Sequence, residues 1–174
     1  MNNPTLVYAF ESWGKNNANI SEQVLKRLGL PVDKQILKIR FDFQVFRNIV
    51  NQNYSQIIGL GQYPSGKTIR IEQVAQNTYG TRSKGYHPID EGPNQITTDL
   101  KLIPTNNSTL TSDAGRFVCN YSMYSILRMK SDSQRFAFIH IPKGINVKDA
   151  TNYVEELLKQ VVVTTSTNVL QNFC

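Results

Sequence analysis

The apolar residues of this chain gather in short β-prone runs separated by turn-rich stretches, and these runs predict strands. The clearest is residues 135–142, where the nearly continuous apolar segment is typical of a buried strand. A different pattern marks residues 35–41, in which Leu37, Ile39 and Phe41 alternate with basic residues. The same criteria predict further strands at residues 5–10, 55–60 and 68–75, and a weaker one at 99–103.

Other segments show the spacing of three to four residues between apolar positions that is typical of amphipathic helices. In the first of them, the apolar residues at positions 20, 24, 25 and 28 share one face, and Gly29 follows as a stop signal. Another begins near Ser112 or Asp113, either of which can cap the first turn with its side-chain oxygen. The predicted helices cover residues 19–28, residues 43–51, the segment from about 113 to 127, and the segment from 147 into the 160s.

Strands and helices alternate along the chain at the spacing of α/β proteins, which predicts a largely parallel sheet. No internal repeat or domain boundary interrupts the pattern, so we expect a single domain over residues 1–174. Two segments are polar instead. Residues 77–95 contain several glycines and prolines and are expected to form a long loop, of a length that tends to be functional. The shorter polar segment, residues 104–111, is rich in Thr, Asn and Ser.

The composition is typical of a globular protein: 40% of the 174 residues are hydrophobic and 18% are charged. No apolar run approaches the roughly 18–20 residues that span a bilayer, and the first residues lack a signal peptide, so we expect a cytoplasmic protein without a membrane partner. The formal net charge is +6. Because the basic residues are scattered, this charge indicates a generally basic surface; a nucleic-acid-binding module is the less favoured alternative.

The sequence predicts neither a metal nor an organic cofactor. A GxxxxGK[ST] spacing runs from Gly61 to Thr68, but a phosphate loop requires a helix directly after its lysine, and the pattern that follows here is that of a strand. There is no CxxC, HExxH or histidine cluster. The two cysteines, Cys119 and Cys174, are too few for a disulfide framework, and Cys174 is the last residue, where fraying is expected.

The candidate chemistry centres on Cys119, which lies in the first turns of a predicted helix. Free amides and aligned peptide dipoles at a helix start favour the thiolate, which needs a nearby base and a group that orients that base. His140 ends the most apolar strand and Glu72 follows alternating isoleucines, whereas His87 lies in the polar loop. Each candidate also has a structural interpretation: Cys119 and His140 as core residues, and Glu72 as a solvent-facing one.

Together these segments resemble the cysteine-type pyroglutamyl peptidases, also called pyrrolidone-carboxylate peptidases. The resemblance rests, in the family's order, on Gln62 and on residues 72–77, 113–121 and 138–142. It implies a three-layer α/β/α sandwich with a mostly parallel, mixed central sheet. It also implies a catalytic triad, with Cys119 as nucleophile, His140 as general base and then acid, and Glu72 as the residue that orients the imidazole.

The resemblance further implies a set of substrate-binding residues: Phe10, Trp13, Asn19, Gln62, Arg82 and Val118. Phe10 and Trp13 would hold the flat lactam ring of pyroglutamate between apolar faces, with Val118 beside them. Gln62 would contact the lactam through its backbone, and Arg82 would lie near the scissile carbonyl. Asn19 falls at a matching place after the first strand.

We therefore expect a cysteine exopeptidase that removes an N-terminal pyroglutamyl residue from peptides under reducing conditions. The chain departs from the family at Ser12, Trp13 and Lys15, and it lacks a helix and strand that the family has between Pro104 and Asp113. These departures affect one wall of the site and the contacts of any homo-oligomer. They leave a second hypothesis open, namely a homologue that keeps the fold but cleaves other small N-terminal acyl groups or has no peptidase activity.

Overall fold

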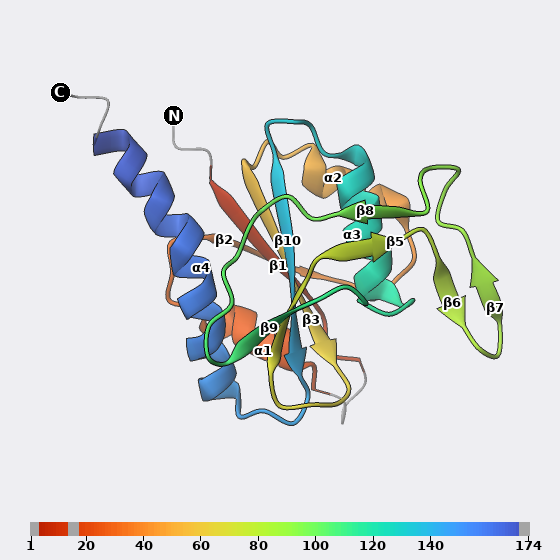
Figure 1. Cartoon of the computed structure of the whole chain (residues 1–174), viewed down its shortest axis with the longest axis horizontal. Coiled ribbons are helices and arrows are strands. Elements are labelled where there is room, and N and C mark those ends of the chain that lie inside the picture. Colours follow the sequence, from red (N-terminus) through yellow and green to blue (C-terminus); the bar gives the residue numbers. More distant parts are fainter. Residues whose placement is uncertain (1–3, 14–17, 171–174) are drawn as a thin grey trace.

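The fold is organised around a six-stranded sheet with the strand order β2-β1-β3-β10-β4-β9 (Figure 1). The computed structural model describes residues 4–13 and 18–170, without the side chains of residues 163–170. Neighbouring strands are parallel except β10 and β4, which are antiparallel, so the predicted largely parallel, mixed sheet is confirmed. The six strands span Thr5–Phe10 (β1), Asp33–Leu37 (β2), Gln56–Tyr63 (β3), Ile69–Glu72 (β4), Ser108–Thr111 (β9) and Arg135–Pro142 (β10).

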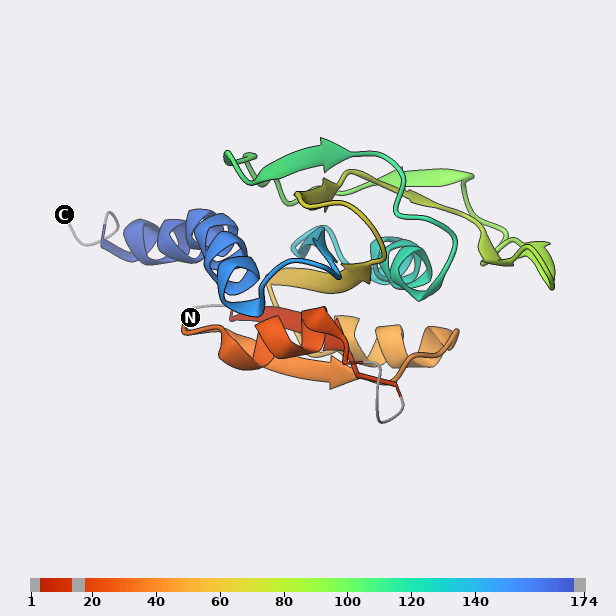
Figure 2. The ribbon, with the colours of Figure 1, turned by 90° about the horizontal axis from the view of Figure 1, so that it is seen from below.

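Helices cover both faces of the sheet, which confirms the predicted α/β/α sandwich (Figure 2). α1 and α4 pack on one face, and α2 and α3 pack on the other. The four helices span Ile20–Arg27 (α1), Phe43–Val50 (α2), Val118–Met129 (α3) and Val147–Leu170 (α4). Asn19 and Asp42 start α1 and α2, because each side chain accepts a hydrogen bond from an amide of the first turn. Within the residues described, no helix is both long and apolar enough to cross a bilayer.

The polar segment predicted as a loop at residues 77–95 instead contains a small hairpin, which projects beyond α3 (Figure 1). Its strands, Tyr79–Thr81 (β6) and Gly85–His87 (β7), are antiparallel. Gly80 makes the pairing feasible, since a Cβ at this position would lie 2.1 Å from the carbonyl oxygen of Gly85. A second antiparallel pair, Val74–Gln76 (β5) with Gln95–Thr97 (β8), packs against α3.

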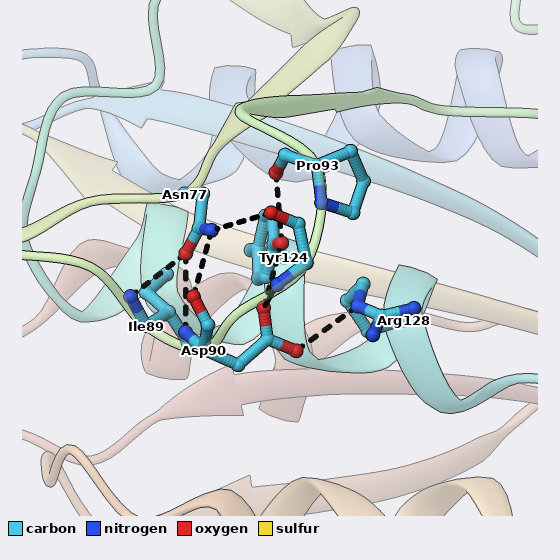
Figure 3. Close-up of polar contacts among 7 residues, drawn as sticks. Asn77, Ile89, Asp90, Pro93, Tyr124 and Arg128 are labelled. Carbon is cyan, nitrogen blue, oxygen red and sulfur yellow. Dashed lines mark hydrogen bonds and ion pairs between the residues drawn. The ribbon is translucent and has the colours of Figure 1, made fainter.

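Polar side chains fasten the loop that follows the hairpin to α3 (Figure 3). The side-chain oxygen of Asn77 accepts hydrogen bonds from the amides of Ile89 and Asp90, at 2.8 and 3.1 Å. The carboxylate of Asp90 in turn accepts from the Tyr124 hydroxyl at 2.8 Å and from Nε of Arg128 at 3.0 Å. This network satisfies polar groups that would otherwise be costly to bury, and it holds an irregular segment in one conformation.

Two predicted strand boundaries were wrong because strands end where their partners end. The strand predicted at residues 35–41 is β2, which ends at Leu37; there it pairs with Phe10, the last residue of β1. β3 runs on to Tyr63, beyond the end predicted for this strand at residue 60, because β10 continues alongside it.

Two further predictions about strands, for residues 99–103 and for residues 104–111, were wrong. Residues 99–103 form no strand: they cross the start of β10, where the amide of Leu100 donates to the carbonyl oxygen of Phe136 and Asp99 accepts from the amide of Phe136. The polar tract at residues 104–111, where the sequence indicates neither the helix nor the strand of the family, contains the edge strand β9, which pairs in parallel with β4.

The helix that carries Cys119 starts later than predicted. It begins at Val118 with Phe117 as N-cap, and no side chain caps it. Asp113 instead accepts a hydrogen bond from the amide of Gly115 at 2.9 Å, in a separate turn where Gly115 has a φ of +77°. Cys119 is therefore the second residue of α3, closer to the helix start than a cap at Ser112 or Asp113 would place it.

Candidate active site

Cys119 stands at the start of α3, against the glycine-bearing part of β3. A Cβ atom on Gly61 would lie 2.7 Å from Sγ of Cys119 and 2.9 Å from Cδ2 of His140, so both side chains border the same point. The thiol is partly exposed and forms no disulfide. The first amides of a helix have no acceptor within the helix, so the peptide dipoles of α3 stabilise negative charge at this end.

Strand register brings His140 and Glu72 together although 68 residues separate them in the sequence. Phe138 of β10 lies opposite Glu72 of β4, and His140 follows two residues later on the same face. Diagonal neighbours in an antiparallel pair lie close enough for long side chains to meet. Nδ1 of His140 and Oε1 of Glu72 are 2.7 Å apart, and both side chains are buried. This hydrogen bond leaves the other ring nitrogen, Nε2, for Cys119.

Thr111 and Arg70 complete the surroundings of Glu72, whose side chain is 0% exposed. The Thr111 hydroxyl donates to Oε2 of Glu72 at 2.6 Å, and Nε of Arg70 lies 3.6 Å from Oε1. The Arg70 guanidinium also covers the ring of Tyr63 at 4.3 Å and donates to the carbonyl oxygen of Asp113. A buried carboxylate is stable only when such partners replace its lost hydration.

The pKa of His140 is raised to about 9. Burial alone would lower this pKa, because the buried imidazolium loses its hydration. The charge of Cys119, the hydrogen bonds to Cys119 and Glu72, and the charge of Glu72 together outweigh burial. At neutral pH the ring is therefore an imidazolium between a sulfur on one side and a carboxylate on the other.

Gly59 and Gly61 of β3 make room for side chains that pack against this face of the sheet. They lie two residues apart on a strand, so both open the same face of the sheet. A Cβ on Gly59 would lie 2.4 Å from the ring of Phe138 and 2.6 Å from the hydroxyl of Tyr8, closer than real Cβ contacts come. The sequence signals for these positioning residues are two glycines within an apolar strand and, at Arg70, a basic residue that alternates with Glu72 along β4.

A mostly apolar pocket of about 220 Å³ opens beside Cys119. Its wall includes five of the six residues predicted to bind substrate: Phe10, Trp13, Asn19, Gln62 and Val118. Phe10 and Val118 are buried, whereas Trp13 is 54% exposed. Pockets for drug-sized ligands typically measure roughly 300–1,000 Å³, so this one suits a smaller group.

The polar residues predicted to bind substrate differ in what their side chains contact. Oε1 of Gln62 accepts a hydrogen bond from the amide of Ile20 at 3.1 Å, so this side chain is engaged at the start of α1. Asn19 caps the same helix and donates to the carbonyl oxygen of Glu11. Arg82 is exposed in the turn between β6 and β7 and is not among the described residues that line the pocket.

Other candidates considered from the sequence lie outside this arrangement. His87 is exposed in β7, with its ring 6.1 Å from that of Tyr79. The GxxxxGK[ST] segment that starts at Gly61 connects two strands and is not followed by a helix. Cys174 lies outside the described residues. Across the part of the chain that the structure describes, no three or more His, Cys, Asp or Glu residues are grouped to hold a metal ion.

No family model matches the chain, but individual proteins do. It is 29% identical over 164 residues to pyrrolidone-carboxylate peptidase 1 of Caldanaerobacter subterraneus, across 79% of this chain and 81% of that protein. The pyrrolidone-carboxylate peptidase of Thermosipho africanus is 26% identical over 203 residues, across 97% of each chain. The crystal structure of pyrrolidone carboxyl peptidase from Thermus thermophilus superposes with a TM-score of 0.75 at 18% identity, across 89% of this chain and 98% of that one, so the two share a fold.

Proposed function

This chain belongs to the pyrrolidone-carboxylate peptidase family, and we propose that it is a cysteine peptidase that removes an N-terminal pyroglutamyl residue from peptides. One observation carries the proposal. The sulfur of Cys119 borders the ring of His140, whose Nδ1 lies 2.7 Å from the buried carboxylate of Glu72, all beside a small apolar pocket. A nucleophile next to a base, with a third group that orients the base, is the arrangement typical of enzymes that transfer acyl groups.

In the proposed mechanism, the Cys119 thiolate attacks the carbonyl carbon of the pyroglutamyl residue. The imidazolium of His140 gives its proton to the nitrogen of the departing amine, and the carbon–nitrogen bond breaks to leave a thioester on Cys119. The neutral imidazole then takes a proton from water, whose oxygen attacks the thioester and releases pyroglutamate. Glu72 holds the Nδ1 side of the ring throughout, so that Nε2 stays directed at the reacting groups.

Backbone amides in the first turn of α3 would stabilise the oxyanion that forms during both attacks. These donors lie next to the nucleophile, and helix geometry leaves them without acceptors within the helix. Removing one oxyanion donor typically costs about 3 kcal/mol of transition-state stabilisation.

We assign the lactam ring to the pocket beside Cys119. Phe10 and Val118 supply buried apolar walls, and Trp13 supplies a more exposed one. Because the side chain of Gln62 is bound at Ile20, contact with the lactam would come from the Gln62 backbone. Arg82 keeps its predicted role only as a hypothesis, since its place in the exposed turn puts it outside the pocket wall.

A nucleophilic thiolate requires reducing conditions, so we place the enzyme in the cytoplasm. Peptide hydrolysis by this mechanism uses no metal or organic cofactor. A homo-oligomer, which the family resemblance suggests, stays a prediction that sedimentation can test.

The direct experiment is hydrolysis of a pyroglutamyl arylamide by the wild type, by Cys119→Ser and by Cys174→Ser, with a thiol reductant present. We expect activity in the wild type and in Cys174→Ser, which serves as the matched cysteine control, and none above background in Cys119→Ser. Undiminished turnover without Cys119 would refute the assignment.

A second candidate function is cleavage of other small N-terminal acyl groups on the same fold. The observation that favours it is Trp13, which is 54% exposed at the pocket and stands where the family has a different aromatic residue. Hydrolysis of alanyl arylamide but not of pyroglutamyl arylamide by the wild type would establish it in place of the first.

A further inference from the structure

The peptide beyond the scissile bond must leave on the His140 side of the site; this step rests on the proposed function. To protonate the departing amine, Nε2 of His140 has to come within roughly 2.6–3.2 Å of its nitrogen. Phe10, which borders the ring pocket, is on β1, and His140 is on β10, two strands across the sheet. With strands about 4.8 Å apart, the two sides of the site are separated by roughly 10 Å.

Lys143 forms the pocket wall on the side from which the peptide departs. It follows the end of β10, three residues after His140, and its backbone amide donates to the carbonyl oxygen of Tyr63 at 2.8 Å. This bond ties the position of Lys143 to the end of β3. The residue lines the pocket while remaining exposed. Its ammonium group makes no ion pair with any residue that the structure describes.

Three other charged side chains near the site either contact protein groups or lie on the opposite side of the pocket. Arg70 is directed at Glu72 and donates to the carbonyl oxygen of Asp113. Glu72 is buried between Thr111 and His140 and has no contact with solvent. Glu11, the acidic residue of the pocket wall, follows β1 on the opposite side of the site from Lys143. Among the described residues that line the pocket, Lys143 is therefore the one cation that can meet a negative group on the departing peptide.

The geometry points to Lys143 as a specificity-determining residue that favours substrates with a carboxylate on the residue directly after pyroglutamate. The carboxylate can come from two sources: the C-terminal α-carboxylate of a pyroglutamyl dipeptide, or an acidic side chain in a longer peptide. A single partly exposed ion pair is expected to raise kcat/KM by roughly twofold to fivefold.

The experiment compares kcat/KM for two matched pairs of substrates. The first pair, pGlu-Glu-amide and pGlu-Gln-amide, differs only in the charge of the second side chain. The second pair, pGlu-Ala and pGlu-Ala-amide, differs only in the C-terminal carboxylate. A preference in the first pair assigns the side chain as the source, and a preference in the second assigns the α-carboxylate; either supports the inference. In 0.5 M NaCl the preference should shrink, because salt screens exposed charges.

Three variants separate charge recognition from a structural role. Lys143→Gln should bring the ratio of kcat/KM within the preferred pair to about 1, and Lys143→Arg should retain the preference because it keeps the charge. Lys148→Gln removes an exposed lysine on α4, away from the pocket wall, and should leave the ratio as in the wild type.

The outcomes distinguish this inference from the proposed function. If the wild type hydrolyses the substrates without a preference in either pair, the role of Lys143 is overturned and the proposed function is not. The same holds if Lys143→Gln leaves the preference intact. If the wild type hydrolyses none of the four substrates and no pyroglutamyl arylamide, the proposed function is overturned together with the inference.

Discussion

Gly61 and Cys119 touch across the interface of β3 and α3: a Cβ atom at position 61 would lie 2.7 Å from the cysteine sulfur. The same atom would lie 2.9 Å from the ring of His140. The absence of a side chain on β3 is therefore what allows nucleophile and imidazole to approach each other. A glycine with no reactive group thus determines the geometry of the two groups that we propose react.

Replacing this glycine should reduce activity far more than stability. In Gly61→Ala the sulfur and the imidazole must both move, and misplacement of reacting groups by about 1 Å can cost on the order of 100-fold in rate. Overpacking should lower the free energy of unfolding by about 1–3 kcal/mol. Arylamide hydrolysis and urea unfolding measure the two effects.

Gly144→Ala is the matched control, because a Cβ at that position would meet nothing within 4 Å and its φ lies outside the left-handed region. It should keep the activity of the wild type. A Gly61→Ala protein with kcat/KM near that of the wild type would show that the sulfur and the ring do not depend on this space.

Glu72→Gln should move the alkaline limit of activity to lower pH. In the wild type the pKa of His140 is raised to about 9, so the imidazolium that we propose protonates the leaving amine is lost as pH rises through that value. Burial lowers the pKa, and Cys119 and Glu72 raise it; removing the carboxylate charge removes part of the raising contribution. The pH profile of kcat/KM measures the shift. An alkaline limb that stays in place in Glu72→Gln would contradict the ion pair.

The same pKa predicts how the free energy of unfolding depends on pH. A group whose pKa is raised by folding stabilises the protein fully at pH values below its pKa in the unfolded chain, here about 6.5. This stabilisation is lost as the pH rises to the folded pKa of about 9. Urea unfolding of the wild type should therefore show stability falling across this interval by more than in a His140→Asn protein. Parallel profiles for the two proteins would argue against the raised pKa.

Thr111→Val tests the hydrogen bond that holds the second oxygen of Glu72. Valine has nearly the same shape but cannot donate, so a buried carboxylate oxygen loses its 2.6 Å partner. Such a loss costs about 1–3 kcal/mol of unfolding free energy, or more because the acceptor is charged. Thr109→Val, at an exposed position of the same strand, is the control and should stay within about 0.5 kcal/mol of the wild type. Equal stability of the two variants would remove Thr111 from the site.

Tyr124→Phe should weaken the fold while leaving the chemistry intact. The Tyr124 hydroxyl lies 2.8 Å from the Asp90 carboxylate and 2.9 Å from the carbonyl oxygen of Pro93, where it fastens the loop to α3 (Figure 3). Its loss should lower the unfolding free energy by about 1–2 kcal/mol, with kcat/KM within about twofold of the wild type. Tyr86→Phe, whose side chain is exposed, is the control. A large loss of activity in Tyr124→Phe alone would mean that the loop takes part in catalysis.

The residues that we propose react could be proposed from the sequence because each stands at a recognisable boundary. His140 ends the most apolar strand, and Cys119 opens a helix with a small-residue turn before it. Their convergence could not be predicted from the local pattern. It depends on the antiparallel register that places Phe138 opposite Glu72, and a shift by one residue would turn Glu72 to the other face.

Residues that position other side chains are harder to predict from the sequence. Thr111 lies in an edge strand with a polar sequence, which lacks the continuous apolar run that marks the buried central strands. Ser112 and Asp113 are good caps by residue type, yet the structure uses Asp113 in a turn with Gly115 and starts the helix at Val118. Local preference was overridden there by the close fit of the helix start against β3.

The most direct test of Cys119 as the nucleophile is to capture the acyl-enzyme. The p-nitrophenyl ester of pyroglutamate has a leaving group that needs no proton, so Cys119 can be acylated even when His140 is replaced by asparagine, whereas hydrolysis of the thioester is slowed. In a His140→Asn, Cys174→Ser protein, acid quenching and peptide mass mapping should find a pyroglutamyl group on the peptide that contains Cys119, and no such group once Cys119 is also replaced by serine. An unmodified Cys119 peptide, or an acyl group on any other residue, would show that Cys119 is not the nucleophile.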